Sequence, residues 1–110
     1  MIHRGHLTVV ADTVYNYTEV TGDVFVRDGI DASGALPVCQ AVGRDVWVSG
    51  SGQVTLPACQ TVGGTVWASG SGQITLPVCQ TVGGDVRAFG SGQITLPVCH
   101  TVGGDVRASD

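Results

Sequence analysis

Four cysteines recur at intervals of 20 residues in this 110-residue chain, and most of the residues between them recur as well. They are Cys39, Cys59, Cys79 and Cys99. The repeating unit reads Gln-(Val/Ile)-Thr-Leu-Pro-x-Cys-Gln-Thr-Val-Gly-Gly-x-Val-x-Ala-Ser-Gly-Ser-Gly. A fixed period in this range is typical of a solenoid, in which each repeat is one coil that buries its apolar side against its neighbours.

Two short runs in each repeat alternate apolar and polar residues with the period of a β-strand. In the repeat that begins at Gln73, the pattern predicts that Ile74, Leu76, Val86 and Ala88 point inward. Glycine-rich segments separate the runs and favour corners. No helical periodicity is present. The sequence therefore predicts an all-β, right-handed parallel β-solenoid of about five coils, with repeats of 20–22 residues.

The repeat extends into the N-terminal third after a two-residue insertion. Five positions of the second coil then match residues 22 positions later: Val14, Tyr17, Val20, Val24 and Val26 correspond to Leu36, Cys39, Val42, Val46 and Val48. The inserted residues fall in the polar segment 27–34, which we expect to be a loop. Residues 7–10 form one more plausible strand. We therefore expect an N-terminal cap over residues 1–13 and a repeat domain over residues 14–110.

The motif Leu-Pro-x-Cys-x-x-Val-Gly-Gly-x-Val-x-Ala resembles the bacterial leucine-rich-repeat class related to receptor L domains. The unit of that class reads Leu-x-x-Leu-x-x-Val-Gly-Gly-x-Leu-x-Val, and the likeness covers residues 14–110. Cysteine replaces the second leucine, and Ser or Gly occupies a turn where many such repeats have asparagine. The resemblance implies stacked parallel strands and a binding scaffold that carries no shared chemistry.

An even number of cysteines in a short chain raises the question of disulfides. In parallel coils about 4.8 Å apart, identical positions point the same way rather than toward each other, which does not suit the disulfide torsion. Four sulfurs in a row also cannot surround one zinc ion tetrahedrally. The repeat therefore predicts a buried column of reduced thiols, with cysteine packing as a small apolar residue.

The outward positions of the second run carry most of the large aromatic side chains. This row reads Phe25, Trp47, Trp67, Arg87 and Arg107, with Phe89 beside it and Asp23, Asp45, Thr65, Asp85 and Asp105 in the next row. Such side chains can stack on their copies in the next coil. Exposed rings flanked by arginine are also typical of protein interfaces. We therefore predict a protein-binding site formed by Phe25, Trp47, Trp67, Arg87, Phe89 and Arg107.

Two other functions remain open at this point. The chain has no lysine and a net charge of −4, which argues against direct binding of nucleic acid and leaves an acidic surface. A phage or bacterial inhibitor that mimics nucleic acid, for example against a host defence complex, could use the acidic rows. The Gln-x-Thr rows allow a sugar-binding or ice-binding surface. No set of residues converges for catalysis, so we expect no enzyme activity, cofactor or metal.

The two ends of the sequence give further expectations. No apolar run reaches the length of a membrane span and the first residues lack an export signal, so we expect a cytoplasmic protein without membrane contact. The last repeat carries no polar cap. Its inward residues Leu96, Cys99, Val102, Val106 and Ala108 would face solvent, which predicts a homodimer through the C-terminal coil; a different partner at that end remains open.

Overall fold

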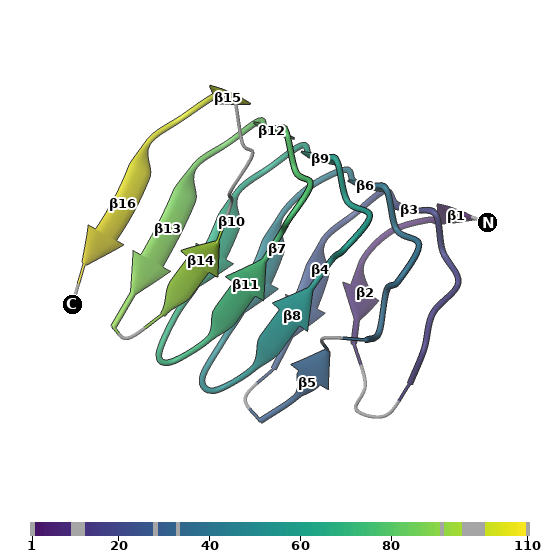
Figure 1. The fold of residues 1–110 in the computed structure, drawn as a ribbon, viewed down its shortest axis with the longest axis horizontal. Coiled ribbons are helices and arrows are strands. Elements are labelled where there is room, and N and C mark those ends of the chain that lie inside the picture. Colours follow the sequence, from purple (N-terminus) through teal and green to yellow (C-terminus); the bar gives the residue numbers. More distant parts are fainter. Residues whose placement is uncertain are drawn as a thin grey trace.

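Backbone hydrogen bonds between residues one repeat apart join the coils. The computed structural model describes residues 2–9, 13–27, 29–32, 34–90, 92–95 and 101–109. The Gln60 N–H donates to the Gln40 carbonyl at 2.7 Å, and the Gln80 N–H donates to the Gln60 carbonyl at 2.9 Å. The result is a parallel β-solenoid of about five turns, without a helix among the described residues (Figure 1). The predicted fold class is confirmed.

A full turn contributes one strand to each of three parallel sheets. The short-strand sheet comprises β1 (Ile2–His3), β3 (Glu19–Val20), β6 (Ala41–Val42), β9 (Thr61–Val62), β12 (Thr81–Val82) and β15 (Thr101–Val102). The aromatic sheet comprises β2 (Leu7–Thr8), β4 (Val24–Val26), β7 (Val46–Val48), β10 (Val66–Ala68), β13 (Val86–Phe89) and β16 (Val106–Ser109). The Gln-x-Thr sheet comprises β5 (Asp31–Ala32), β8 (Gln53–Thr55), β11 (Gln73–Thr75) and β14 (Gln93–Thr95).

Two of these three sheets were predicted from the alternating runs, and the short-strand sheet was not. Its strands are two residues long, as in β9, which is too short for alternation to show in the sequence. They form because the coils on either side supply hydrogen-bonding partners. For the same reason the predicted loop over residues 27–34 contains strand β5, which pairs with β8. The strand expected near residues 7–10 is present as β2, while Val10 lies outside the described residues.

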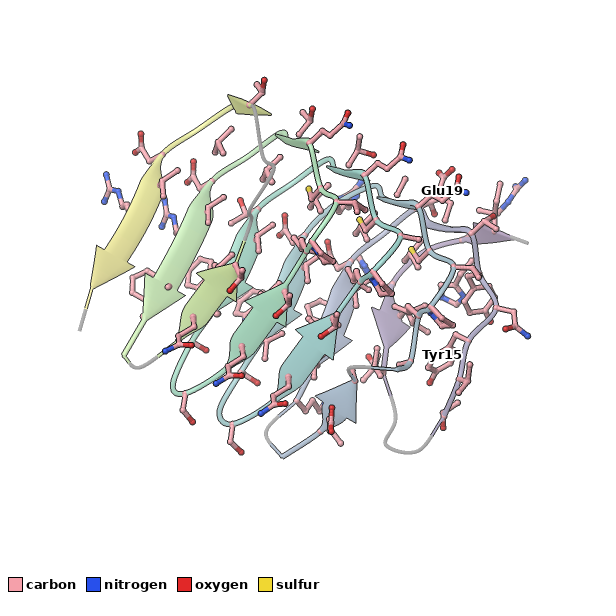
Figure 2. The ribbon with its side chains drawn as sticks, in the orientation of Figure 1. Tyr15 and Glu19 are labelled. Atoms are coloured by element: carbon pink, nitrogen blue, oxygen red, sulfur yellow. The ribbon has the colours of Figure 1, made fainter. Side chains whose placement is uncertain are left out.

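The inward positions form apolar columns along the axis of the stack, and Figure 2 shows the corresponding rows of side chains. Ile74, Leu76 and Val86 are buried as predicted, and Ala88 is half-buried. No polar or charged residue is buried in the described part of the chain. Burial of apolar surface therefore drives the packing between coils.

The cysteines form one of these columns. Cys39, Cys59 and Cys79 are free thiols with no exposed surface, and Cys99 lies outside the described residues. The Sγ of Cys59 donates to the Thr61 carbonyl at 3.3 Å, and the Sγ of Cys39 donates to the Ala41 carbonyl at 3.4 Å. Burial raises the pKa of the Cys59 thiol to about 12. The predicted reduced column is thus confirmed for these three cysteines.

Glycine is required where successive coils come closest. A Cβ atom at Gly83 would meet the carbonyl oxygen of Gly63, and a Cβ atom at Gly63 would meet that of Gly43. At the corner between β10 and β11, Gly70 has a φ of 63°, a left-handed conformation that side chains disfavour. The first glycine of the Gly-Gly pair is therefore a steric requirement of stacking in these coils.

We expect Gly83→Ala to lower the free energy of unfolding by about 1–3 kcal/mol, because the added methyl group forces two coils apart. Gly34→Ala is the matched control, since a Cβ atom there meets nothing within 4 Å. Urea denaturation of both variants tests this. Equal stability of the two variants would contradict the close approach.

We also expect the native thiols to be unreactive. In a Cys99→Ser variant at pH 8, a chromogenic disulfide reagent should modify no thiol, because Cys39, Cys59 and Cys79 are buried and the pKa of Cys59 is about 12. Denaturation without a reductant should then release all of them. Fewer reactive thiols after denaturation would indicate disulfides instead.

Candidate protein-binding surface

The outer face of the aromatic sheet carries the side chains that the sequence singled out. In the three-residue strands of this sheet, β4, β7 and β10, the middle residue points outward between two buried neighbours, as Trp67 does between Val66 and Ala68. The parallel register pairs Phe25 with Trp47, Trp47 with Trp67, and Trp67 with Arg87. The structure therefore brings these predicted residues together on one face.

Four aromatic rings on this face form a row in which each ring contacts the next. The ring centroids of Phe25 and Trp47 are 6.2 Å apart, and those of Trp47 and Trp67 are 5.1 Å apart with nearly parallel planes. Phe89 continues the series, with its centroid 5.1 Å from that of Trp67. We call Phe25, Trp47, Trp67 and Phe89 the ring row. The rings stabilise each other by stacking, and 38% of the Trp47 surface still remains exposed.

Arg87 lies at one end of the ring row and is held from two sides. Its Cζ atom is 5.6 Å from the centroid of the Trp67 ring, a cation–π distance. Its Nη2 atom is 2.7 Å from Oδ2 of Asp85. One coil further, the Nη2 atom of Arg107 lies 3.2 Å from Oδ2 of Asp105. Both predicted arginines thus flank the rings, each paired with the aspartate two residues before it.

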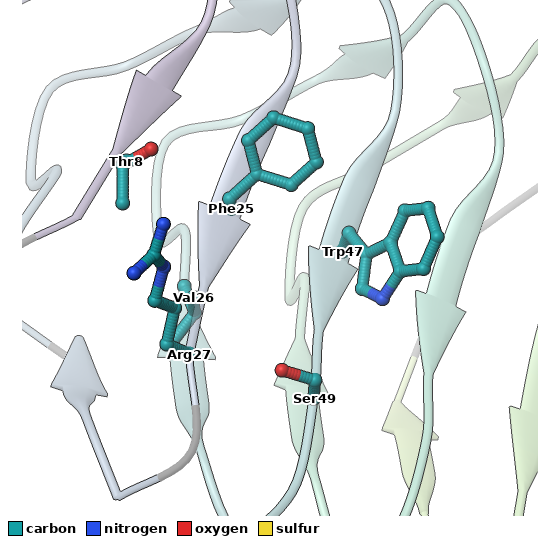
Figure 3. Close-up of a pocket in the computed structure, with 6 residues that line it drawn as sticks. All are labelled: Thr8, Phe25, Val26, Arg27, Trp47 and Ser49. Carbon is teal, nitrogen blue, oxygen red and sulfur yellow. The ribbon is translucent and has the colours of Figure 1, made fainter.

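An open hollow of about 450 Å³ lies at the other end of the ring row (Figure 3). Its lining consists of Thr8, Phe25, Val26, Arg27, Trp47 and Ser49. The sequence prediction omitted Arg27, because it fell in the segment expected to be a loop. One signal was present: Arg27 follows Phe25 by two positions, so strand alternation places both side chains on the same face.

The aspartates beside the ring row hold successive coils together. We call Asp23, Asp45, Thr65, Asp85 and Asp105 the Asp column. The Asp45 N–H donates to Oδ1 of Asp23 at 2.9 Å, and the Thr65 N–H donates to Oδ1 of Asp45 at 2.7 Å. Further along, the Asp105 N–H donates to Oδ1 of Asp85 at 2.8 Å. This bond and the Arg87 guanidinium lower the pKa of Asp85.

A second aromatic cluster, which the sequence analysis missed, lies near the N-terminus. Tyr15 and Tyr17 stack with their centroids 5.9 Å apart, and the His3 ring lies 4.8 Å from Tyr17. Both tyrosines are partly buried against the core (Figure 2 labels Tyr15). Tyr17 takes the position that Cys39 has one coil later, whereas Val14, which the sequence aligns with the buried Leu36, is exposed. The spacing of two residues between the tyrosines was the available signal.

Among the residues that the structure describes, no group of three or more His, Cys, Asp or Glu side chains is arranged to hold a metal ion. The same residues contain no helix long and apolar enough to cross a membrane. In comparisons with protein-family models, curated proteins and solved structures, no match to this chain is found. The fold defines the chain as a parallel β-solenoid repeat protein.

We expect the contribution of Asp85 to stability to depend on pH. The pKa of Asp85 in the folded protein is below its ordinary value of 3.8, so its stabilising effect is present above that value and is lost as the pH falls through the folded pKa. The melting temperatures of wild type and Asp85→Asn should therefore differ at neutral pH and converge in acid. Glu19→Gln, which removes a carboxylate outside the Asp column, is the control. A constant difference between wild type and Asp85→Asn down to pH 2 would contradict this role.

Proposed function

We propose that this chain is a non-enzymatic binding module that recognises another protein through the ring row. The observation that carries the proposal is the continuous contact of four rings across β4, β7, β10 and β13, next to an open hollow. Rings held by their neighbours lose little side-chain entropy on binding, so they are efficient anchors for a partner. The likeness of the repeat to the bacterial leucine-rich-repeat class, a binding scaffold, supports the same function.

The hollow suggests what the partner presents. Phe25 and Trp47 provide apolar surface, and Thr8 and Ser49 provide hydroxyl groups. Among the described residues, no ion pair involves Arg27, whereas Arg87 and Arg107 are both paired with aspartates. The hollow therefore suits an apolar side chain next to a carboxylate, because a guanidinium binds a carboxylate through two parallel hydrogen bonds. We infer a partner segment that combines an aromatic or aliphatic anchor with Asp or Glu.

The alternative that uses the acidic rows has less support. A mimic of nucleic acid needs carboxylates that are free to meet a basic surface. The Oδ1 atoms of Asp23, Asp45 and Asp85 each accept a backbone N–H from the next coil. Arg87 neutralises one of these carboxylates further. The geometry therefore gives the Asp column a structural role, and we base the proposal on the rings.

Selection from a display library of random peptides tests the proposal. We expect the enriched peptides to pair an apolar residue with Asp or Glu. Trp47→Ala should weaken their binding at least about 30-fold, the loss expected when an interface anchor is truncated. Arg27→Gln should weaken the binding of peptides that carry the acidic residue and leave the binding of their uncharged analogues unchanged. Gln73→Ala, an exposed change on the Gln-x-Thr sheet, is the matched control.

The fold of each variant is checked by its melting temperature before binding is compared. Peptides that bind Trp47→Ala as well as wild type would contradict a site on the ring row. If Asp45→Asn abolishes binding and Trp47→Ala does not, the acidic rows would be the binding surface. A library that yields no binder to the wild-type protein would remove the support for a peptide-binding role.

A further inference from the structure

Strand β16 is the outermost described strand of the aromatic sheet (Figure 1). In this sheet the first valine of a strand donates its N–H to a carbonyl of the following coil. The Val46 N–H donates to the Thr65 carbonyl at 2.9 Å, and the Val86 N–H donates to the Asp105 carbonyl at 2.8 Å. In this pattern the N–H of each such valine points to the following coil. The N–H and carbonyl of Val106 therefore point away from β13, to the side on which the structure describes no further strand, which we call the open edge.

Apolar surface adjoins this open edge. The Val106 side chain is 70% exposed, although its counterparts Val46 and Val66 are fully buried. A hollow of about 390 Å³ lies between β13, β14 and β16, and Ile94 and Val106 are among its lining residues. Of the other residues predicted at a dimer interface, Val102 is half-buried, Leu96 and Cys99 lie outside the described residues, and the side chain of Ala108 is not described. An edge of this kind favours pairing with another strand.

The charges on β16 indicate which strand fits. Asp105 and Arg107 flank Val106 on the outer face, and their side chains are 63% and 62% exposed. In an antiparallel pair of two identical strands centred on Val106, each Asp105 lies opposite Arg107 of the second copy. Opposite charges at facing positions stabilise a strand pair. The edge is therefore complementary to itself.

We propose that the chain forms a two-fold dimer in which the β16 strands of two copies pair antiparallel, centred on Val106. The two Val106 residues then exchange N–H···O=C bonds across the axis, as a hydrogen-bonded pair does in antiparallel sheets. The apolar ends of both stacks are covered by the same contact. Because the contact is isologous, the assembly closes at two copies and does not grow into a fibre.

Other registers fit less well. Only alternate residues of β16 direct their backbone groups to the open edge. Few registers of the β16–β16 pair can therefore form hydrogen bonds. A pair centred on Arg107 places two guanidinium groups opposite each other, which is destabilising. A pair centred on Ala108 places Arg107 opposite Ser109, which carries no charge. The charge pattern therefore selects the register centred on Val106.

Charge reversal tests the dimer and its register together. We expect sedimentation equilibrium to give wild type a mass twice the 11.2 kDa of the chain. Asp105→Arg places Arg opposite Arg107, and Arg107→Asp places Asp opposite Asp105, so each variant alone should dimerise at least about tenfold more weakly. An equimolar mixture of the two should recover the dimer, because every facing pair again has opposite charges. Arg44→Asp, an exposed change of the same size, is the matched control and should remain dimeric.

Each other outcome overturns a stated part of the proposal. A wild-type mass of one chain up to millimolar concentration rejects the dimer. Masses that grow with concentration indicate head-to-tail stacking. A dimer that survives both reversals uses another surface, and a mixture that stays monomeric rejects the register. Circular dichroism confirms that the variants, which change exposed residues, remain folded.

A cross-link provides an independent measurement. In a hydrogen-bonded antiparallel pair the facing Cα atoms are about 5.5 Å apart, within the range of a disulfide. Val106→Cys should therefore give a covalent dimer on mild oxidation, at concentrations where Thr61→Cys, on the exposed face of the short-strand sheet, remains monomeric. Absence of the cross-link in a folded Val106→Cys protein would overturn the pairing centred on Val106.

Discussion

The in-register hydrogen bond between neighbouring coils is the interaction on which the rest of this structure depends. A backbone N–H donates to a carbonyl one repeat away, as from Gln60 to Gln40, and the step recurs along the stack. Identical residues are therefore placed in columns. Each column then has to satisfy its own physical requirement, because any unfavourable contact is repeated at every step. Apolar side chains, the cysteines and the close-packed glycines each meet one such requirement.

The same register organises the outer surface into two parts. Tryptophan occupies the outward position at 47 and 67, and the rings stack on each other. Arginine takes this position at 87 and 107 and pairs with the aspartate two residues earlier. A single change of residue type along one column thus adds ion pairs beside the stacked rings, and the two meet where Arg87 lies over Trp67.

Much of this architecture follows from the sequence because the repeat averages out local ambiguity. The period, the inward and outward residues of two strands, the reduced thiols and the stacked rings were all predicted from the repeating unit. The short-strand sheet was not, because two residues such as Thr61 and Val62 carry no readable alternation and become a strand only through their neighbours. Arg27 lies at the segment that interrupts the repeat, so no other copy indicated its place in the hollow. Tyr17 was aligned with Cys39, but its stacking on Tyr15 has no counterpart in the later repeats.

The Asp column shows how such a chain can change its length during evolution. Four of its members accept a backbone N–H from the next coil through a side-chain oxygen: Asp23, Asp45, Thr65 and Asp85. The bond persists at Thr65, where threonine replaces aspartate. A tandem duplication of residues 61–80 would therefore insert a coil that already matches both of its neighbours. It would add one tryptophan to the ring row and separate the two ends of the molecule by about 4.8 Å more. Unequal recombination between repeats is thus a route to a longer binding face that leaves both ends as they are.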